Sequence, residues 1–286
     1  MLQVARLAPT LLGESNDLVL GFFHNAQRPD GSFQDRAGNA DLYYTVFGLE
    51  GLLALSSTLP DRTGDYLQQF GNGEELDFIH LSCLARAWQT VSTSKMPDGI
   101  RDTVMRRLDE HRSSDGGYAL TPGSDAGSAY ACFIALGLLE DLNGNVDADG
   151  LRRCLEGMRA ADGGYANYPE APESSTPSTA AAMMILHQLG DAPDSRVGDW
   201  LLAQCHPEGG FFAVPGAPMP DLLSTATALH ALAALQRDIE PVREPCLDFV
   251  DTLWTNAGGF YGNWADDIID CEYTYYGLLA LGHLSL

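Results

Sequence analysis

Acidic residues and one histidine lie directly before, or at the start of, stretches rich in apolar residues. A carboxyl kept dry among apolar neighbours has a raised pKa and can donate a proton. A histidine can exchange one near neutral pH. These residue types in this setting indicate general acid–base chemistry. The candidate catalytic residues are Asp221, Asp270, Glu272 and His80.

The same residues also have purely structural interpretations. An Asp just before an apolar helix is an N-cap, which accepts hydrogen bonds from backbone N–H groups at the helix start. Glu272 would lie in a first helical turn, where the helix dipole favours a negative charge. His80 at a helix start is more often a hydrogen-bonded structural residue than a base. The sequence leaves both interpretations open.

Aromatic residues cluster on the same apolar stretches. Such a stripe is usually core packing, but around a central cavity it would suit an isoprenoid chain or a carbocation. The candidate cavity residues are Tyr43, Tyr44, Phe47, Tyr130, Phe133, Tyr273, Tyr275 and Tyr276.

The elements that would position these residues belong to a repeat built on a glycine and an aromatic residue. The aromatics Phe33, Tyr118, Tyr165, Phe211 and Phe260 are separated by 85, 47, 46 and 49 residues. The first interval is nearly double the other three, which indicates a sixth repeat that lacks the glycines. Each unit reads as a polar-faced helix, a glycine turn and an apolar helix, so twelve helices and no sheet are predicted.

The apolar helices share a predicted start position. It is occupied by Asp41, Asp77, Asp125, Ser175, Asp221 and Asp270, and four residues later stand Thr45, Leu81, Ala129, Thr179, Thr225 and Thr274. An Asp or Ser in each repeat predicts six capped helices.

The combination of Gly-Gly-aromatic, a Pro/Gly loop and Asp-x-x-x-Thr resembles the prenyltransferase and squalene-cyclase repeat, from about residue 20 to residue 286. The resemblance implies an all-α, α6/α6 toroid formed by residues 1–286 as one domain, with the chemistry at the rim where the inner helices begin. The last unit, from Gly258 to Leu278, looks most like a protein prenyltransferase β subunit, especially the Rab geranylgeranyl type.

The resemblance also shows where the chain departs from the family. Protein prenyltransferases hold zinc with an Asp, a Cys and a His, but Leu223 and Tyr273 occupy the Cys and His positions beside Asp221. Leucine cannot bind zinc, so no metal cofactor is expected. The loop before Asp221 lacks the family's cations for a diphosphate. Terpene cyclases of this family protonate an alkene with an Asp, and Glu272 stands at the corresponding position.

Composition excludes some partners. The net charge is −23, which repels nucleic acid and anionic membrane surfaces. No apolar stretch is long enough to span a membrane, and the six separated cysteines are typical of a cytoplasmic protein. We therefore expect a cytoplasmic protein that binds an isoprenoid or similar lipid-like molecule. The alternatives are a prenyltransferase or terpene-cyclase enzyme using rim acids, and a scaffold that binds a protein partner.

Overall fold

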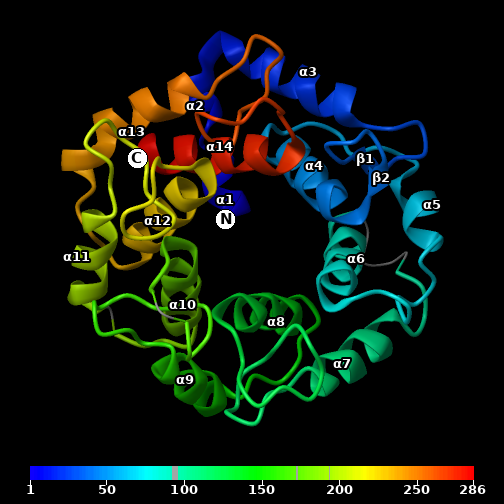
Figure 1. The fold of residues 1–286 in the computed structure, drawn as a ribbon. Helices are drawn as coiled ribbons and strands as arrows, with labels where there is room; N and C mark the ends of the chain where they lie inside the picture. The colour runs from blue at the N-terminus through cyan, green and yellow to red at the C-terminus, as the bar shows by residue number, and fades with distance from the viewer. Residues whose placement is uncertain (92–95, 172, 193) are drawn as a thin grey trace.

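The computed structural model describes residues 1–91, 96–171, 173–192 and 194–286, and it arranges the helices in two concentric rings (Figure 1). The inner ring consists of α4 (Leu42–Ala54), α6 (Phe78–Val91), α8 (Ala129–Asp141), α10 (Thr176–Gln188), α12 (Leu222–Ala234) and α14 (Cys271–Leu284). The outer ring consists of α3 (Asn16–Ala26), α5 (Thr63–Gln68), α7 (Ile100–Glu110), α9 (Ala148–Gly157), α11 (Ser195–Ala203) and α13 (Glu240–Thr252). The predicted α/α toroid is therefore confirmed.

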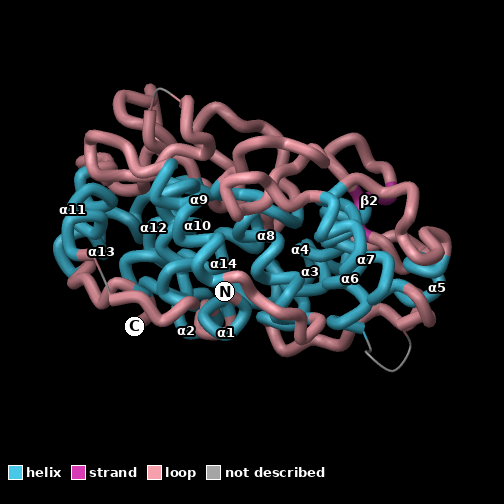
Figure 2. The backbone as a smooth tube through the Cα atoms, turned by 90° about the horizontal axis from the view of Figure 1, so that it is seen from below, coloured by secondary structure: helices cyan, strands magenta, loops and turns pink. Residues whose placement is uncertain are grey.

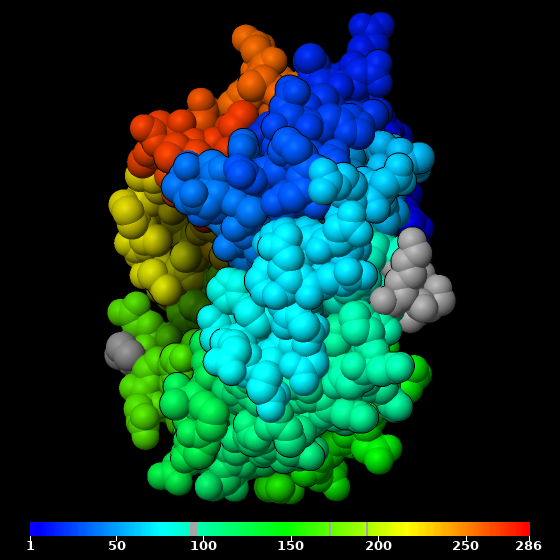
Figure 3. Space-filling view, turned by 90° about the vertical axis from the view of Figure 1, so that its right-hand side faces the viewer, coloured from blue at the N-terminus to red at the C-terminus, as the bar shows by residue number. Residues whose placement is uncertain are grey.

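The inner ring closes on itself. Each inner helix packs against the next, and α14 of the last repeat packs against α4 of the first. In the space-filling view the N-terminal residues in blue lie against the orange and red C-terminal part (Figure 3). Closure buries the apolar faces that an open array of repeats would leave exposed at its ends.

The glycine turns close the outer ring in the same way. Gly209 has a φ of +93°, and a Cβ there would lie 1.7 Å from the carbonyl oxygen of Pro245 on the following outer helix. Gly258 has a φ of +87°, and its Cβ would lie 2.0 Å from the carbonyl oxygen of Leu18 on α3. Only glycine tolerates both the backbone conformation and this close approach. The glycine turn of the last repeat therefore packs directly against the first outer helix.

The two faces of the toroid differ. Figure 2 shows the long loops of the repeats gathered on one face and the N-terminal helices α1 (Leu2–Ala5) and α2 (Pro9–Leu12) on the other. A short 3₁₀ helix, η1 (Gly13–Ser15), connects α2 to the first repeat. Helix α1 packs on α14 and α4, and a Cβ at Gly282 would lie 2.1 Å from the carbonyl oxygen of Val4. Among the described residues, no helix is both long and apolar enough to cross a membrane.

A hydrogen bond ties each described glycine turn to its inner helix. The backbone N–H of the turn aromatic donates to a side chain in the second turn of that helix, as in Phe211 to Thr225 Oγ1 at 2.9 Å. The equivalent pairs are Phe33 with Thr45, Tyr165 with Thr179, and Phe260 with Thr274. In the third repeat the acceptor is Cys132 Sγ, 3.3 Å from the N of Tyr118.

The prediction that α8 begins near Asp125 is wrong by three residues. The N-cap is Ser128, whose Oγ accepts the N–H of Ala131 at 3.1 Å. The position four residues after the cap is therefore Cys132 and not Ala129. Tyr165, Phe211 and Phe260 each precede their cap by ten residues, and the same spacing from Tyr118 leads to Ser128.

The other predicted helix starts agree with the structure. Asp41, Ser175, Asp221 and Asp270 each accept a backbone N–H as an N-cap. Asp77 does the same for His80, at 2.8 Å. The expected absence of any sheet needs a small correction, because β1 (Phe33–Gln34) and β2 (Ala40–Asp41) form a two-stranded antiparallel ribbon. This ribbon brings the first loop back to the start of α4.

Candidate functional site

The inner helices all begin at the loop-bearing face, so the residue two places after each cap lies at that rim. These residues are Tyr43, Ile79, Tyr130, Pro177, Leu223 and Glu272. Glu272 is the single carboxyl among these six described positions. The predicted acid therefore lies among apolar and aromatic side chains.

The interior of the ring is accessible to solvent beyond the rim. On α12 partial exposure recurs at Leu223, Thr227 and His230, while the intervening residues are buried. Pro177, Ala181 and Met184 repeat the pattern on α10. An inner helix is covered on its outer side by the outer ring and laterally by its neighbours, so this helical spacing marks the side that faces the ring axis.

The side of the ring where the first and last repeats meet is lined by aromatic rings. The ring of Phe47 on α4 lies 5.0 Å from that of Tyr43 and 5.6 Å from that of Tyr276 on α14. It also lies 5.8 Å from the ring of Tyr275, which is itself only 1% exposed. The predicted aromatics of these two helices therefore converge. Their tilted and edge-to-face arrangement is the one that aromatic pairs prefer.

The remaining predicted cavity residues lie at different depths. Tyr44 packs edge-on against Tyr43, and Tyr273 faces Tyr276 at 6.5 Å. Tyr130 on α8 is 38% exposed, and Phe133 on the same helix is partly buried against the core. Tyr275 is part of the packed wall, because it has almost no accessible surface.

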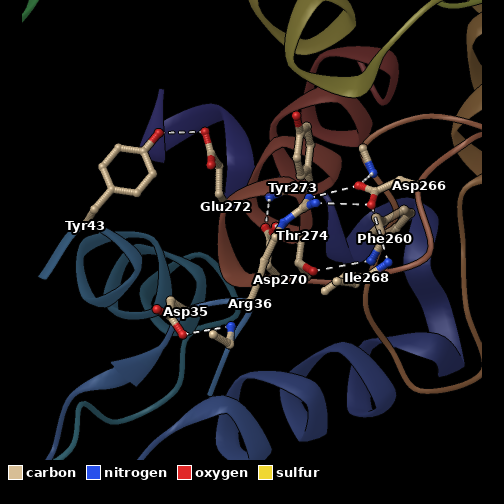
Figure 4. A network of polar contacts seen from close by, with 12 residues as sticks. Asp35, Arg36, Tyr43, Phe260, Asp266, Ile268, Asp270, Glu272, Tyr273 and Thr274 are labelled. Carbon is tan, nitrogen blue, oxygen red and sulfur yellow. Dashed lines mark hydrogen bonds and ion pairs between the residues drawn. The ribbon is translucent and has the colours of Figure 1, made fainter. Parts of the chain in front are cut away.

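Glu272 is held by a residue from the first repeat. The hydroxyl of Tyr43 donates a hydrogen bond to Glu272 Oε1 at 2.6 Å (Figure 4). Burial raises the pKa of Glu272 to about 7, against the opposing effect of this hydrogen bond, and the charge of Asp270 adds to the increase. Glu272 therefore exchanges its proton near neutral pH, as a general acid or base must.

Arg36, which the sequence analysis did not single out, joins the two ends of the ring. Its Nε lies 2.6 Å from Asp270 Oδ2 and its Nη2 lies 2.8 Å from Asp266 Oδ2. Its guanidinium also lies over the ring of Tyr273, 5.3 Å from the centroid. Figure 4 shows this network between the first loop and the start of α14. The sequence could have indicated Arg36, because it is a cation in the loop that precedes the N-cap Asp41 of the first inner helix.

An open pocket of about 490 Å³ lies beside this network. We call it the seam pocket, and its lining residues are Arg36, Tyr44, Asn263, Ala265, Asp266, Glu272 and Tyr273. This lining is more polar than the mostly apolar cavity that the sequence predicted. Arg36 contributes a cation, but two carboxylates already neutralise it. The seam pocket is therefore built for hydrogen bonding and carries no free cation among its lining residues.

The other predicted catalytic residues have structural partners. His80, expected at the cavity mouth, instead bonds through Nδ1 to Asp77 at 2.9 Å and does not line the seam pocket. Asp221 caps α12 through the N–H and the hydroxyl of Ser224, both at 2.8 Å. Asp270 caps α14 and binds Arg36. Burial raises the pKa of Asp221 and of Asp270.

The zinc position of protein prenyltransferases does not fit the residues present. Asp221 is engaged in its cap, and Leu223 and Tyr273 supply no ligand where the resemblance places one. Across the described part of the chain, no group of three or more His, Cys, Asp or Glu side chains could hold a metal ion. The residues at these three positions therefore do not form a zinc site.

Comparison with known proteins places the geometry in context. The family model described as the prenyltransferase alpha-alpha toroid domain matches residues 14–81, 78–197 and 179–285. No curated protein matches the chain in sequence.

Solved structures share the fold at low sequence identity. The type II terpene cyclase MstE from Scytonema, in complex with its substrate geranylgeranyl dihydroxybenzoate, is 14% identical, with 97% of each chain covered and a TM-score of 0.66. Candida albicans protein geranylgeranyltransferase-I, complexed with GGPP, is 16% identical, covers 99% of this chain and 81% of that one, and has a TM-score of 0.56. A glycosidase in complex with glucose is 12% identical, with 99% and 96% covered and a TM-score of 0.58. The fold thus serves several chemistries, and the site must decide between them.

Proposed function

The chain belongs to the prenyltransferase alpha-alpha toroid family, and on that basis we propose that it binds an isoprenoid or similar apolar chain inside the ring. The observation that carries this proposal is the aromatic wall formed by α4 and α14, on the same ring whose helices α10 and α12 present partly exposed residues at helical spacing. A concave, largely apolar site with a few polar groups at its mouth is the usual form of a small-molecule pocket.

Zinc-dependent transfer of the Rab geranylgeranyl type has no support at this site. The zinc ligands are missing, and Arg36 is already paired with Asp266 and Asp270. A diphosphate bound there would have to displace these carboxylates and leave two negative charges uncompensated. A chain whose head group is not a diphosphate agrees better with the seam pocket.

The test is direct binding of a fluorescent geranylgeranyl probe without a diphosphate. We expect saturable binding, and we expect Tyr276→Ala and Phe133→Ala to change the affinity more than Tyr261→Ala, which we place outside the cavity. Extraction of the purified protein followed by mass spectrometry would reveal a co-purified lipid. Absence of saturable binding would overturn the proposal and favour a scaffold that binds a protein partner.

A second candidate function is proton-initiated cyclisation of a polyprenyl chain, with Glu272 as the acid. The observation that favours it is the pKa of about 7 for a carboxyl that Tyr43 holds at the rim of an aromatic wall. In this reaction the Glu272 proton adds to a terminal alkene, and aromatic faces stabilise the resulting cation.

This second function is tested by incubating the protein with geranylgeranyl compounds and separating the products by gas chromatography. Glu272→Gln should abolish any cyclised product while retaining probe binding, and His80→Gln is the matched control that should retain both. Unchanged turnover by Glu272→Gln would remove Glu272 from the mechanism and leave the binding function standing.

A further inference from the structure

Two cysteines from different rings touch where the third repeat meets the fourth. Cys132 on the inner helix α8 and Cys154 on the outer helix α9 have their sulfur atoms 3.8 Å apart. Cys132 has no exposed surface and Cys154 is 1% exposed. The contact lies away from the ring axis, so it is independent of the proposed function.

The turn around these sulfurs admits only glycine at two positions. A Cβ at Gly117 would lie 2.2 Å from Cys154 Sγ and 3.0 Å from Cys132 Sγ. A Cβ at Gly127 would lie 2.7 Å from Cys154 Sγ. The two thiols are therefore enclosed by backbone at the junction of a glycine turn, an inner helix and an outer helix.

The two thiols differ in chemical character. Cys132 occupies the position that threonine holds in the four other glycine-turn repeats, and it accepts the N–H of Tyr118 at 3.3 Å. The hydrogen bond with Cys154 and this backbone N–H lower the pKa of Cys132. The hydrogen bond with Cys132, together with burial and the nearby Asp115 carboxyl, raises the pKa of Cys154. The Tyr118 N–H stabilises a thiolate on Cys132, which makes Cys132 the nucleophile of the pair.

We propose that Cys132 and Cys154 form a redox site, in which hydrogen peroxide oxidises Cys132 and Cys154 resolves the product to a disulfide. The Cys132 thiolate attacks one peroxide oxygen, the O–O bond breaks, and the leaving hydroxide takes a proton to become water. The resulting sulfenic acid loses its hydroxyl as a second water when the Cys154 sulfur displaces it and gives up its proton. Two thiols and one molecule of hydrogen peroxide thus yield one disulfide and two waters.

Such a disulfide would tie α8 to α9 across the two rings. The sulfurs must approach from 3.8 Å to about 2.05 Å to form the bond. A cross-link between residues that are 22 positions apart in the chain constrains the unfolded state. Oxidation should therefore raise the thermal midpoint of unfolding, and a reductant should reverse this rise.

The experiment treats the folded, full-length protein with hydrogen peroxide and maps its thiols. Arg112, Arg152, Arg153 and Arg159 place Cys132 and Cys154 in separate tryptic peptides, residues 113–152 and 154–159. We expect a cross-linked pair of these two peptides that dithiothreitol separates, with the loss of two free thiols. A folded protein whose thiols oxidise without this cross-link, or an equal yield from the chain unfolded in urea, would overturn the proposal.

Matched variants identify the pair. Cys132→Thr installs the residue found in the other repeats and keeps an acceptor for the Tyr118 N–H, so it should fold but form no cross-link. Cys83→Ala removes a cysteine on α6 and should leave the cross-link unchanged. If Cys132→Thr fails to fold by circular dichroism, Cys154→Ser serves in its place. A peroxide-induced rise in the thermal midpoint that persists in either pair variant contradicts the assignment.

Discussion

The hydroxyl of Tyr43 on α4 donates a hydrogen bond of 2.6 Å to Oε1 of Glu272 on α14, although 229 residues separate them in the chain. This bond stabilises the ionised carboxylate, whereas burial favours the neutral acid. The closed ring thus lets a residue of the first repeat tune the acidity of one in the last.

Removal of this hydrogen bond should raise the pKa of Glu272 further. Tyr43→Phe keeps the aromatic ring and deletes only the hydroxyl, so the stabilisation of the carboxylate is lost. The pKa, about 7 in the wild type, should move to a higher value in the variant. Carbon NMR of labelled glutamate side chains would measure both values, and Tyr44→Phe is the matched control. An unchanged or lower pKa in Tyr43→Phe would contradict the assignment of the bond.

Glu272 should also make the stability of the protein depend on pH. Burial raises its pKa from 4.5 to about 7. In the pH window between these two values, the folded protein retains a proton that the unfolded chain has lost. The wild type therefore loses stability as the pH rises through the window. Glu272→Gln cannot titrate and should gain on the order of 2 kcal/mol relative to the wild type between about pH 5 and pH 8. Urea denaturation of both proteins at the two pH values tests this. A difference in the free energy of unfolding between variant and wild type that is the same at both pH values would refute it.

The ion pairs of Arg36 should contribute to closure of the ring. Arg36→Ala leaves the Asp270 side chain, which is 2% exposed, without its partner, and it releases Asp266 as well. Because Arg36 is itself 34% exposed, we expect a loss of about 1–3 kcal/mol in the free energy of unfolding. Arg243→Ala, which breaks a pair with the exposed Glu244, should cost less than about 0.5 kcal/mol. Equal effects of the two substitutions on the free energy of unfolding would show that Arg36 does not stabilise the closure of the ring.

The residue at which α8 begins can be tested by substituting its N-cap. Ser128 is fully buried and accepts the N–H of Ala131, so Ser128→Ala should destabilise the protein by about 1 kcal/mol. Asp125→Ala should have a smaller effect, because Asp125 lies before the helix and is exposed. Chemical denaturation of both variants distinguishes the two starts. A larger loss for Asp125→Ala would restore the start first predicted from the sequence.

Metal analysis of the purified protein checks the zinc argument. We expect no stoichiometric zinc when none is added, since Leu223 and Tyr273 stand where zinc ligands would be needed. Stoichiometric zinc that is lost in Asp221→Ala would contradict this expectation and revive the transferase interpretation.

The sequence by itself determined the repeats, and through them the fold. A glycine and an aromatic recurring at a near-constant interval, each followed by a capped apolar helix, are local signals that need no knowledge of distant contacts. The start of α8 was misplaced because Asp125 and Ser128 are both good caps. The ten-residue spacing between aromatic and cap in three other repeats leads to Ser128, and the hydrogen bonds of the folded chain show that it is the cap.

Only the tertiary structure decided which residues form the site. Arg36, Tyr43, Asp270 and Glu272 meet because the ring closes, and closure joins segments more than 200 residues apart in the chain. The pKa of Glu272 and the neutralisation of Arg36 depend on burial and on partners supplied by the opposite end of the chain. Composition and spacing describe each repeat on its own. The chemistry at the seam pocket arises from contacts between the first repeat and the last, and no local sequence pattern contains these contacts.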